Sequence, residues 1–521
     1  MFWADKIAEE IEKKFGKQAP VLIRDEKTVS GRVHVGSMRG VAIHGAVHDA
    51  LADRGVTNTF KYELNDFDVF DSIPEYLPRE KFEKYLGMML RDVPSPEPSA
   101  KNFAEYFGNE FRAVIEGAGF TPELYWGSEL YLSGKMDGVI REAIEHSKDI
   151  VRIYKEVSGS QKEDEWLPIA VVCPQCNKVA TTEASEFDGE TVQVHCRTDK
   201  APYTNGCDYK GRVSPFGGKA KLLWKVEWPA KWKVNGVMVE GAGKDHSTKG
   251  GSRDVGNHIS KEVFNYEPPF DVPYEFFLVG GKKMSSSKGR GSSAKEIASL
   301  VPAKIFRLAL LGKEINQQVN FDPEGDTIPV LYDQYDKLAL GYQTVKNDDY
   351  ARLFELIHPK KAKSDFAGSE VGLRLPRFSQ VAFVVQMPHL DLEKEFPEAE
   401  AAELQERAEY ARRWLAEYAP EKFVFKLHDA LPDSAKNFSP VQKKALHAIL
   451  KYIEESDTML LGEDLHHFLH GLKESEPISP AELFSAIYLS FLDKPMGPKA
   501  GWFLSVLQRE FVLKRLQEAA A

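Results

Sequence analysis

Two short stretches of the chain carry residue types suited to holding a nucleotide. The first, SGRVHVGSMRG at 30–40, places His34 and Gly36 just ahead of an apolar run. A glycine here lets a ligand approach the backbone, and a helix beginning at this point would offer free amide groups and a positive dipole end to a phosphate. The stretch therefore indicates a phosphate site, although a plain turn between a strand and a helix would look the same.

The second stretch, GGKKMSSSKGRGSS at 280–293, concentrates positive charge. It holds Lys282, Lys283, Lys288 and Arg290 with no acidic residue among them. Mobile cationic groups can follow the charge that grows on a triphosphate during attack at its α-phosphorus. We interpret this stretch as a phosphate-binding loop, with a solvated linker as the alternative.

The cysteines form a third candidate site. Cys173 and Cys176 in CPQC can bind one tetrahedral metal ion, because two thiolates separated by two residues can reach the same ion. Cys196 and Cys207 would complete a structural zinc site, although the ten residues between them exceed a compact spacing, and His195 could replace Cys196. Four buried thiols without a metal are the alternative.

These residues need elements that bring them together. Residues 21–25 are predicted to form a buried strand, residues 36–55 a helix ended by a glycine, and residues 57–67 a second strand. This strand–helix–strand order favours a parallel sheet with right-handed crossovers. Residues 235–246 and 274–279 are expected to supply strands of a second half, so the fold class is α/β with a Rossmann-type sheet.

The length of 521 residues exceeds one ordinary core and predicts three or four structural units. Beyond about residue 292 the strand signals largely vanish and helical periodicity recurs. We expect six segments: 1–75, the first half of the sheet domain; 76–165, a helical insertion; 166–213, the cysteine-bearing insertion; 214–291, the second half with the basic loop; 292–365, a helical junction; and 366–521, an α-helical domain.

Composition narrows the class of protein. With 42% hydrophobic and 28% charged residues the chain is typical of globular proteins, and no apolar run approaches the roughly 20 residues of a membrane-spanning helix. The N-terminus lacks the pattern of a signal peptide, so a cytosolic location is expected. A net charge of -11 argues against coating of nucleic acid in general, while local clusters can still bind phosphates.

The order of the motifs resembles a known family. HVGS followed by KMSSS, on either side of a two-part α/β region, resembles the HIGH and KMSKS pair of class I aminoacyl-tRNA synthetases. NDFDVFDSIP, YLSGKMD, WKVEWPAKW and GKDHSTKGGS resemble blocks of the class I lysyl-tRNA synthetases, and VNFDPEGD and LYDQYDKL extend the likeness into the helical part. Ser37 and Ser286 depart from the HIGH and KMSKS patterns in the way that this family does, while Asn65 stands where the family often has an acid.

The resemblance implies an enzyme that activates L-lysine with ATP and Mg²⁺ and transfers it to tRNA(Lys), with the last domain binding the anticodon. A monomer is expected. Glu227 is a guess for the partner of the substrate's ε-ammonium. The implied ATP contacts are His34, Gly36, Ser37, Lys283, Met284, Ser285, Ser286, Ser287 and Lys288, and the implied amino-acid contacts are Gly31, Trp224, Asp245, His246 and Tyr274.

Two alternatives stay open at this point. A class I synthetase for glutamate would share the architecture, but its pocket would need a cation, whereas a lysine pocket would need a carboxylate or aromatic faces near Tyr274. A non-catalytic RNA-binding paralogue would be expected to have lost the phosphate-binding motifs. His34, Gly36 and Lys283 are all present.

Overall fold

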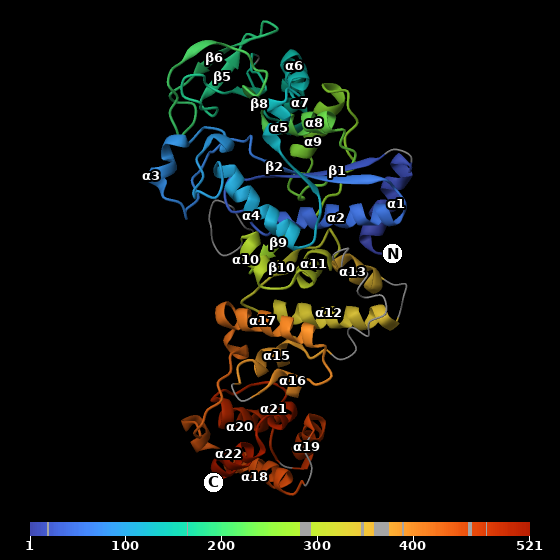
Figure 1. Ribbon diagram of the computed structural model, residues 1–521, viewed down its shortest axis with the longest axis vertical. Helices are drawn as coiled ribbons and strands as arrows, with labels where there is room; N and C mark the ends of the chain where they lie inside the picture. The colour runs from blue at the N-terminus through green and yellow to red at the C-terminus, as the bar shows by residue number, and fades with distance from the viewer. Residues whose placement is uncertain are drawn as a thin grey trace. The chain divides into compact units, whose positions relative to one another are not determined.

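A computed structural model describes residues 1–17, 20–163, 165–281, 293–344, 349–358, 375–387, 390–456, 461–475 and 477–521. The chain divides into two compact units (Figure 1). The first contains Met1–Phe321 and Gly341–Gly368, and the second contains Asp322–Leu340 and Ser369–Ala521.

A parallel sheet lies at the centre of the first unit. Its strands β1 (Val21–Thr28), β2 (Asn58–Asn65) and β3 (Glu123–Trp126) follow the order β1-β2-β3, and helix α2 (Ser37–Asp53) connects the first two. The predicted strand–helix–strand unit and its parallel pairing are therefore confirmed. Helix α2 is buried on nearly every side, which fits its apolar sequence.

Two layers of helices cover this sheet. Helix α2 packs on one face, together with α1 (Trp3–Phe15) (Figure 1). Helix α8 (Trp224–Asn235) lies against the other face, because Lys231 of α8 donates a hydrogen bond to Glu63 of β2. The alternation of side chains along β1 thus directs successive residues toward different helices.

The second half of the sheet domain is less regular than predicted. Residues 235–246 form no strand; Val239 makes single parallel bridges to Ile23 and Phe270, and Gly243 makes one to Tyr274. A Cβ atom on Gly241 would lie 2.1 Å from the carbonyl oxygen of Val272, so the backbones pass very closely here. Of residues 274–279, the last three form β9 (Phe277–Val279), which pairs in parallel with β10 (Val319–Phe321).

The remaining elements of the first unit extend this core. Pro302 separates α10 from α11, because proline cannot continue a helix from the preceding turn. The cysteine-bearing segment forms the antiparallel sheet β5-β6-β7 and the pair β4-β8. The remaining elements of the first unit are α3 (Arg79–Phe82), η1 (Glu83–Tyr85), η2 (Leu90–Asp92), α4 (Phe103–Gly117), α5 (Gly127–Leu132), α6 (Asp137–Glu145), α7 (Ser147–Ser158), β4 (Ile169–Val171), β5 (Thr182–Ser185), β6 (Val192–Cys196), β7 (Lys210–Val213), β8 (Ala220–Leu222), α9 (Ser252–Glu262), α10 (Ala294–Ser299), α11 (Ala303–Leu311) and α13 (Asp349–Ile357).

The described elements of the second unit are helical, as predicted from their periodicity. Ser439 and Ser479 each begin a helix with a capping box followed by proline, which fixes the starts of α18 and α20. The elements are α12 (Thr327–Thr344, which continues into the first unit), α15 (Phe378–Val384), α16 (Leu392–Glu395), α17 (Ala401–Glu417), η3 (Glu421–Phe423), η4 (Asp433–Asn437), α18 (Pro440–Glu454), α19 (Gly462–Ser475), α20 (Pro480–Leu492), α21 (Ala500–Val506) and α22 (Arg509–Ala520).

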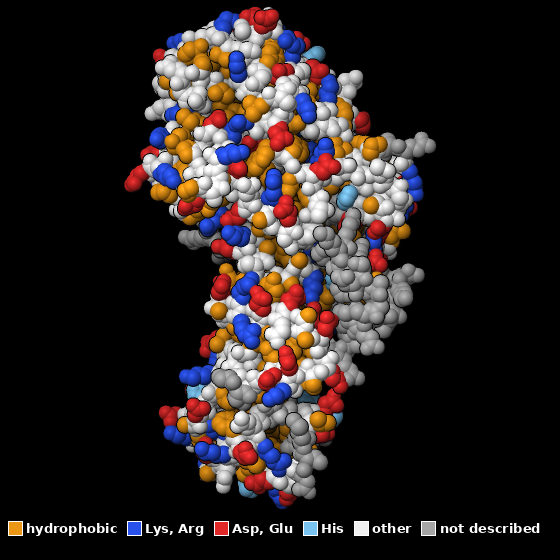
Figure 2. Space-filling view, viewed as in Figure 1, with side chains coloured by type: hydrophobic (Ala, Val, Ile, Leu, Met, Phe, Trp, Pro, Cys, Tyr) orange, Lys and Arg blue, Asp and Glu red, His pale blue; other side chains and the backbone are white. Residues whose placement is uncertain are grey.

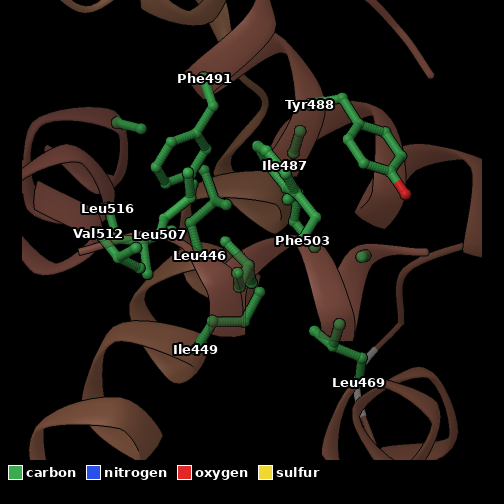
Figure 3. Close-up of a cluster of buried hydrophobic side chains, with 14 of the residues drawn as sticks. Leu446, Ile449, Leu469, Ile487, Tyr488, Phe491, Phe503, Leu507, Val512 and Leu516 are labelled. Carbon is green, nitrogen blue, oxygen red and sulfur yellow. The ribbon is translucent and has the colours of Figure 1, made fainter. Parts of the chain in front are cut away.

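An apolar core holds the last helices of this unit together. Leu446 of α18, Leu469 of α19, Phe491 of α20, Phe503 of α21 and Leu516 of α22 are all buried in one cluster (Figure 3). Burial of large apolar side chains from five helices is the main stabilising contribution available to such a domain.

The surface carries mixed charge. In Figure 2, Lys and Arg side chains are interspersed with Asp and Glu rather than gathered into one field of a single sign. Among the helices that the structure describes, none combines the length and apolarity needed to cross a membrane.

Candidate active site

A pocket of about 260 Å³ opens beside strand β1 and the start of helix α2. Ligands of open parallel sheets bind at this kind of position, where the strands end and the following helices begin. The pocket brings together predicted site residues that lie up to 240 positions apart in the sequence: His34, Gly36, Ser37, Trp224, Asp245, His246 and Tyr274.

The first motif lines one end of this pocket, but its backbone differs from the prediction. The amides of Ser37, Met38 and Arg39 donate hydrogen bonds of 3.1, 2.9 and 3.1 Å to backbone carbonyls at positions 34–36. The prediction that the first helical turn offers free amides is therefore wrong for these three groups. What the motif contributes is the side chain of His34, the accessible backbone at Gly36 and the dipole of α2.

The predicted ATP contacts Lys283, Met284, Ser285, Ser286, Ser287 and Lys288 lie outside the described residues. The positions on either side of this stretch are described. The amide of Gly281 donates to Asn320 Oδ1 at 2.7 Å, and Ser293 forms an antiparallel bridge with His34. The chain that leaves the basic stretch therefore lies directly beside the first motif.

Aromatic rings form one wall of the pocket. Trp224 and Trp228 stack with their centroids 5.2 Å apart and their planes at 14°, and His246 meets both rings edge-on. Glu240 fixes this wall, because its carboxylate accepts hydrogen bonds from the indole nitrogens of Trp228 and Trp232 at 2.7 and 2.9 Å.

A buried ionic network supports the pocket from behind. Arg24 is fully buried and its guanidinium pairs with Glu240 at 2.9 Å and with Glu63 at 2.6 Å. Lys231 of α8 binds the other oxygen of Glu63 at 2.6 Å. Burial alone would raise the pKa of Glu63, but Lys231 and Arg24 outweigh it and lower the pKa to about 2. The network joins β1, β2 and α8 to Glu240 on the pocket wall.

Two residues of the predicted site do not line the pocket. Gly31 packs beside Tyr76 and has a φ of +152°. A Cβ atom at this position would lie only 2.9 Å from the tyrosine hydroxyl, so local packing explains why a glycine is needed here. Glu227, the guessed ε-ammonium partner, is buried, accepts a hydrogen bond from Tyr131 and pairs with Lys221 at 3.4 Å. Glu227 therefore does not face the pocket, and the guess that it pairs with the ε-ammonium is wrong.

Comparisons with known proteins identify the family. The sequence model of the family described as tRNA synthetases class I (K) matches residues 1–360. The chain belongs to the class I lysyl-tRNA synthetase family. A lysine–tRNA ligase of Methanosarcina barkeri is 32% identical over 99% of this chain and 97% of its own length. That of Archaeoglobus fulgidus is 30% identical over all of both chains, and that of Pyrococcus horikoshii is 32% identical over 99% of each.

Among solved structures, a glutamate–tRNA ligase from Elizabethkingia meningosepticum in complex with its amino acid is a weaker match. It has a TM-score of 0.42 and 12% identity over 96% of this chain and 99% of that chain.

Sequence reasoning missed several pocket residues of this class I synthetase. Asp25, Lys27, Arg39 and Glu240 all line the pocket. Burial lowers the pKa of Lys27, and the nearby Asp25 carboxylate opposes that shift. The signal was present in VLIRDEKT, because four consecutive charged residues inside a buried strand require partners or a ligand.

The four cysteines of this synthetase meet at one point, and none of them forms a disulfide. Their sulfur atoms all lie within 4.8 Å of one another, with 3.6 Å between Cys173 and Cys207 and 3.7 Å between Cys176 and Cys196. Tetrahedral zinc with Zn–S bonds of about 2.3 Å requires sulfurs roughly 3.8 Å apart, so the cluster fits zinc. His195 is not part of the cluster, since its Nε2 bonds Asp208 at 2.8 Å.

Proposed function

We propose that the protein is a lysine–tRNA ligase, which makes lysyl-adenylate and pyrophosphate from L-lysine and ATP and then acylates the 3′-terminal ribose of tRNA(Lys). The observation that carries this proposal is one pocket that unites His34, Gly36 and Ser37 with the tryptophan wall and Tyr274. The full-length similarity to lysine–tRNA ligases supports it.

The first step joins the two small substrates. An oxygen of the lysine carboxylate attacks the α-phosphorus of ATP, the bond to the bridging oxygen breaks, and pyrophosphate leaves with that electron pair. No protein nucleophile is required, so the protein contributes in-line alignment and stabilisation of charge. His34 would contact the phosphates, residues 283–288 would neutralise the leaving group, and Mg²⁺ would arrive bound to ATP.

The second step transfers the lysyl group. A hydroxyl of the terminal ribose attacks the carbonyl carbon of the adenylate, and AMP leaves as the ester forms. Gly36 and Ser37 would keep the adenylate phosphate at the edge of the sheet, while the tryptophan wall would hold the stem of the lysine.

The charges around the pocket suit a substrate ammonium. Five acidic residues line it, of which Glu26, Glu240 and Glu275 pair with Arg24 or Lys244. Of the lining cations Lys27 and Arg39, Arg39 donates through its terminal nitrogens to the backbone carbonyls of Leu310 and Glu314. A substrate ammonium would be attracted by the carboxylate of Asp25. The retained His34 and Gly36 likewise argue against a non-catalytic paralogue.

Other parts of the chain complete the proposed enzyme. Cys173, Cys176, Cys196 and Cys207 would hold a structural zinc ion. Residues 292–365 would contact the acceptor stem, and residues 366–521 would bind the anticodon by stacking and base-edge contacts to unpaired bases. We further propose a monomer that acts in the cytosol.

The test is ATP–pyrophosphate exchange with each of the twenty amino acids, followed by acylation of tRNA(Lys). Exchange that requires lysine supports the proposal. Exchange with glutamate, or with no amino acid, contradicts it.

A further inference from the structure

The acidic residues around the pocket differ in whether an arginine or lysine forms a salt bridge with them. Glu26 and Glu240 pair with Arg24, and Glu275 pairs with Lys244 at 2.7 Å. Asp25 has no such partner: among the described residues, no lysine or arginine nitrogen lies within 4.0 Å of its carboxylate. Its oxygens contact only the amide of Glu26 at 2.8 Å and the ring of His44 at 3.4 Å.

His44 does not supply the missing charge. The amide of Gly241 can only donate, and it donates to His44 Nε2 at 2.8 Å, so this nitrogen carries no proton. The proton is then on Nδ1, which lies 2.8 Å from the carbonyl oxygen of Gly40. Burial opposes protonation, but Asp25 outweighs it and raises the pKa of His44 above its usual value; the neutral ring is favoured by geometry, because protonation would break the hydrogen bond from Gly241.

Asp25 is therefore a nearly buried carboxylate without a salt bridge to a lysine or arginine of the described residues, and it influences the charge of Lys27, two positions along β1, from beyond 4.0 Å. The residue is only 8% exposed, and it lines the pocket. An ionised carboxylate that is nearly buried is unfavourable unless a cation or several hydrogen bonds stabilise its charge. A substrate cation entering the pocket would do so.

Asp25 and Tyr274 lie tightly against Gly40 of α2. A Cβ atom on Gly40 would lie 2.4 Å from Asp25 Oδ2 and 2.7 Å from the hydroxyl of Tyr274. Any side chain at position 40 would thus collide with these two oxygen atoms and displace them. Tyr274 and Tyr62 add aromatic surface beside the carboxylate, a setting that suits an ammonium group on an apolar stem.

The position of Asp25 also fixes which end of the substrate it meets. Gly40 lies three residues into helix α2, about one turn beyond Ser37 at the phosphate end. Lys27 lies two residues nearer the carboxyl end of β1 and lines the same pocket. A lysine whose carboxylate faces His34 and Lys27 would direct its other end toward Asp25.

We propose that the carboxylate of Asp25 receives the ε-ammonium of the substrate and that glycine at position 40 allows Asp25 and Tyr274 to take their positions at the pocket. This inference rests on the proposed function. Asp25 is thereby a specificity-determining residue, and the neutral amide of Asp25→Asn could not replace it.

The experiment compares lysine with norleucine, which has the same chain and α-ammonium but no ε-ammonium. In ATP–pyrophosphate exchange, Asp25→Asn should lower kcat/KM for lysine on the order of 10²-fold. It should leave norleucine exchange and the KM for ATP nearly unchanged. Inhibition by 6-aminohexanoate, which keeps the terminal ammonium and lacks the α-ammonium, should weaken as much as lysine binding does. Asp149→Asn, which removes an exposed carboxylate of the same unit, serves as the matched control.

The outcomes separate this inference from the proposed function. If the wild-type protein does not activate lysine, the proposed function fails. If it does, and Asp25→Asn keeps the preference for lysine or weakens norleucine equally, the inference alone is overturned. Should Asp25→Asn not fold, Asp25→Ser removes the carboxylate with a smaller side chain. Loss of the preference for lysine over norleucine in this folded variant supports the inference, and a retained preference overturns it.

Discussion

The backbone of His34 pairs with that of Ser293 in an isolated antiparallel bridge. The amide of the next residue, Ala294, donates to the carbonyl of Val33 at 2.8 Å, so two segments 259 positions apart are joined at the pocket. A ligand held by His34 is consequently within reach of the chain that follows the basic stretch. The backbone pairing does not depend on the imidazole ring.

The first prediction concerns the imidazole ring of His34, which can be removed without breaking the backbone pairing. Replacing the ring in His34→Ala should lower the rate of ATP–pyrophosphate exchange by about 10²–10³-fold, because a donor to the transition-state charge is lost. Binding of tRNA(Lys), measured by filter retention, should stay nearly unchanged. His146→Ala, at an exposed position on the same unit, is the control. Parallel loss of exchange and tRNA binding would instead indicate a role in folding.

The second prediction concerns the buried guanidinium of Arg24. Arg24→Met removes the guanidinium that pairs with both Glu240 and Glu63 and leaves Glu63 with Lys231, which should destabilise the first unit by about 3–5 kcal/mol. It should also raise the KM for lysine, because Glu240 orients Trp228. Urea unfolding and exchange kinetics measure the two effects. Arg79→Met removes an exposed pair with Glu83 and should have little effect; equal destabilisation by both variants would argue against the network.

The third prediction is a pH dependence of stability. The pKa of Glu63 is about 2 in the folded protein, below its usual value of 4.5, because Lys231 and Arg24 outweigh the effect of burial. A lowered folded-state pKa contributes stability above pH 4.5 that is lost as pH falls toward 2. This contribution is on the order of 3 kcal/mol.

Glu63→Gln tests this sign. The variant should be less stable than wild type at pH 7, and the difference between the two free energies of unfolding should shrink as the pH falls from about 4.5 to 2. Urea titrations at several pH values measure that difference. A difference in the free energy of unfolding that stays constant with pH would show that Glu63 does not cause the pH dependence.

The fourth prediction concerns the cysteine cluster. Protein purified without chelators should contain about one zinc ion per chain, and Cys176→Ser should lose it. Removal of the metal should lower the Tm of the insertion, since a structural site contributes its binding energy to folding. Elemental analysis and calorimetry measure both. Absence of zinc from fully folded protein would contradict the assignment.

The sequence predicted the local elements well, because hydrophobic periodicity is a local property. Strand β1, helix α2 and strand β2 lie close to their predicted positions, and the described elements of residues 375–521 are helical as the periodicity predicted. The failures occur where backbones approach each other closely. Residues 235–246 look like a strand, but they make only single bridges, and the backbones of Gly241 and Val272 approach each other closely there.

The pocket itself was only partly predictable. Its motif residues were found by resemblance, whereas Asp25 and Glu240 were not. Alternation along β1 directs Arg24 toward Glu240, which is 216 positions away, and Asp25 toward α2. Which face of the strand meets which helix depends on tertiary packing, and periodicity in one strand does not contain that information.

Helix α13 links the end of the first unit to its beginning. Arg352 of α13 pairs with Asp5 of α1 at 3.0 Å and Arg307 donates to the carbonyl of Leu356. Because residues 322–340 belong to the second unit and residues 341–368 to the first, the two units are interleaved in the sequence. No single proteolytic cut can separate them intact, and during synthesis the first unit stays incomplete until part of the second has already emerged from the ribosome.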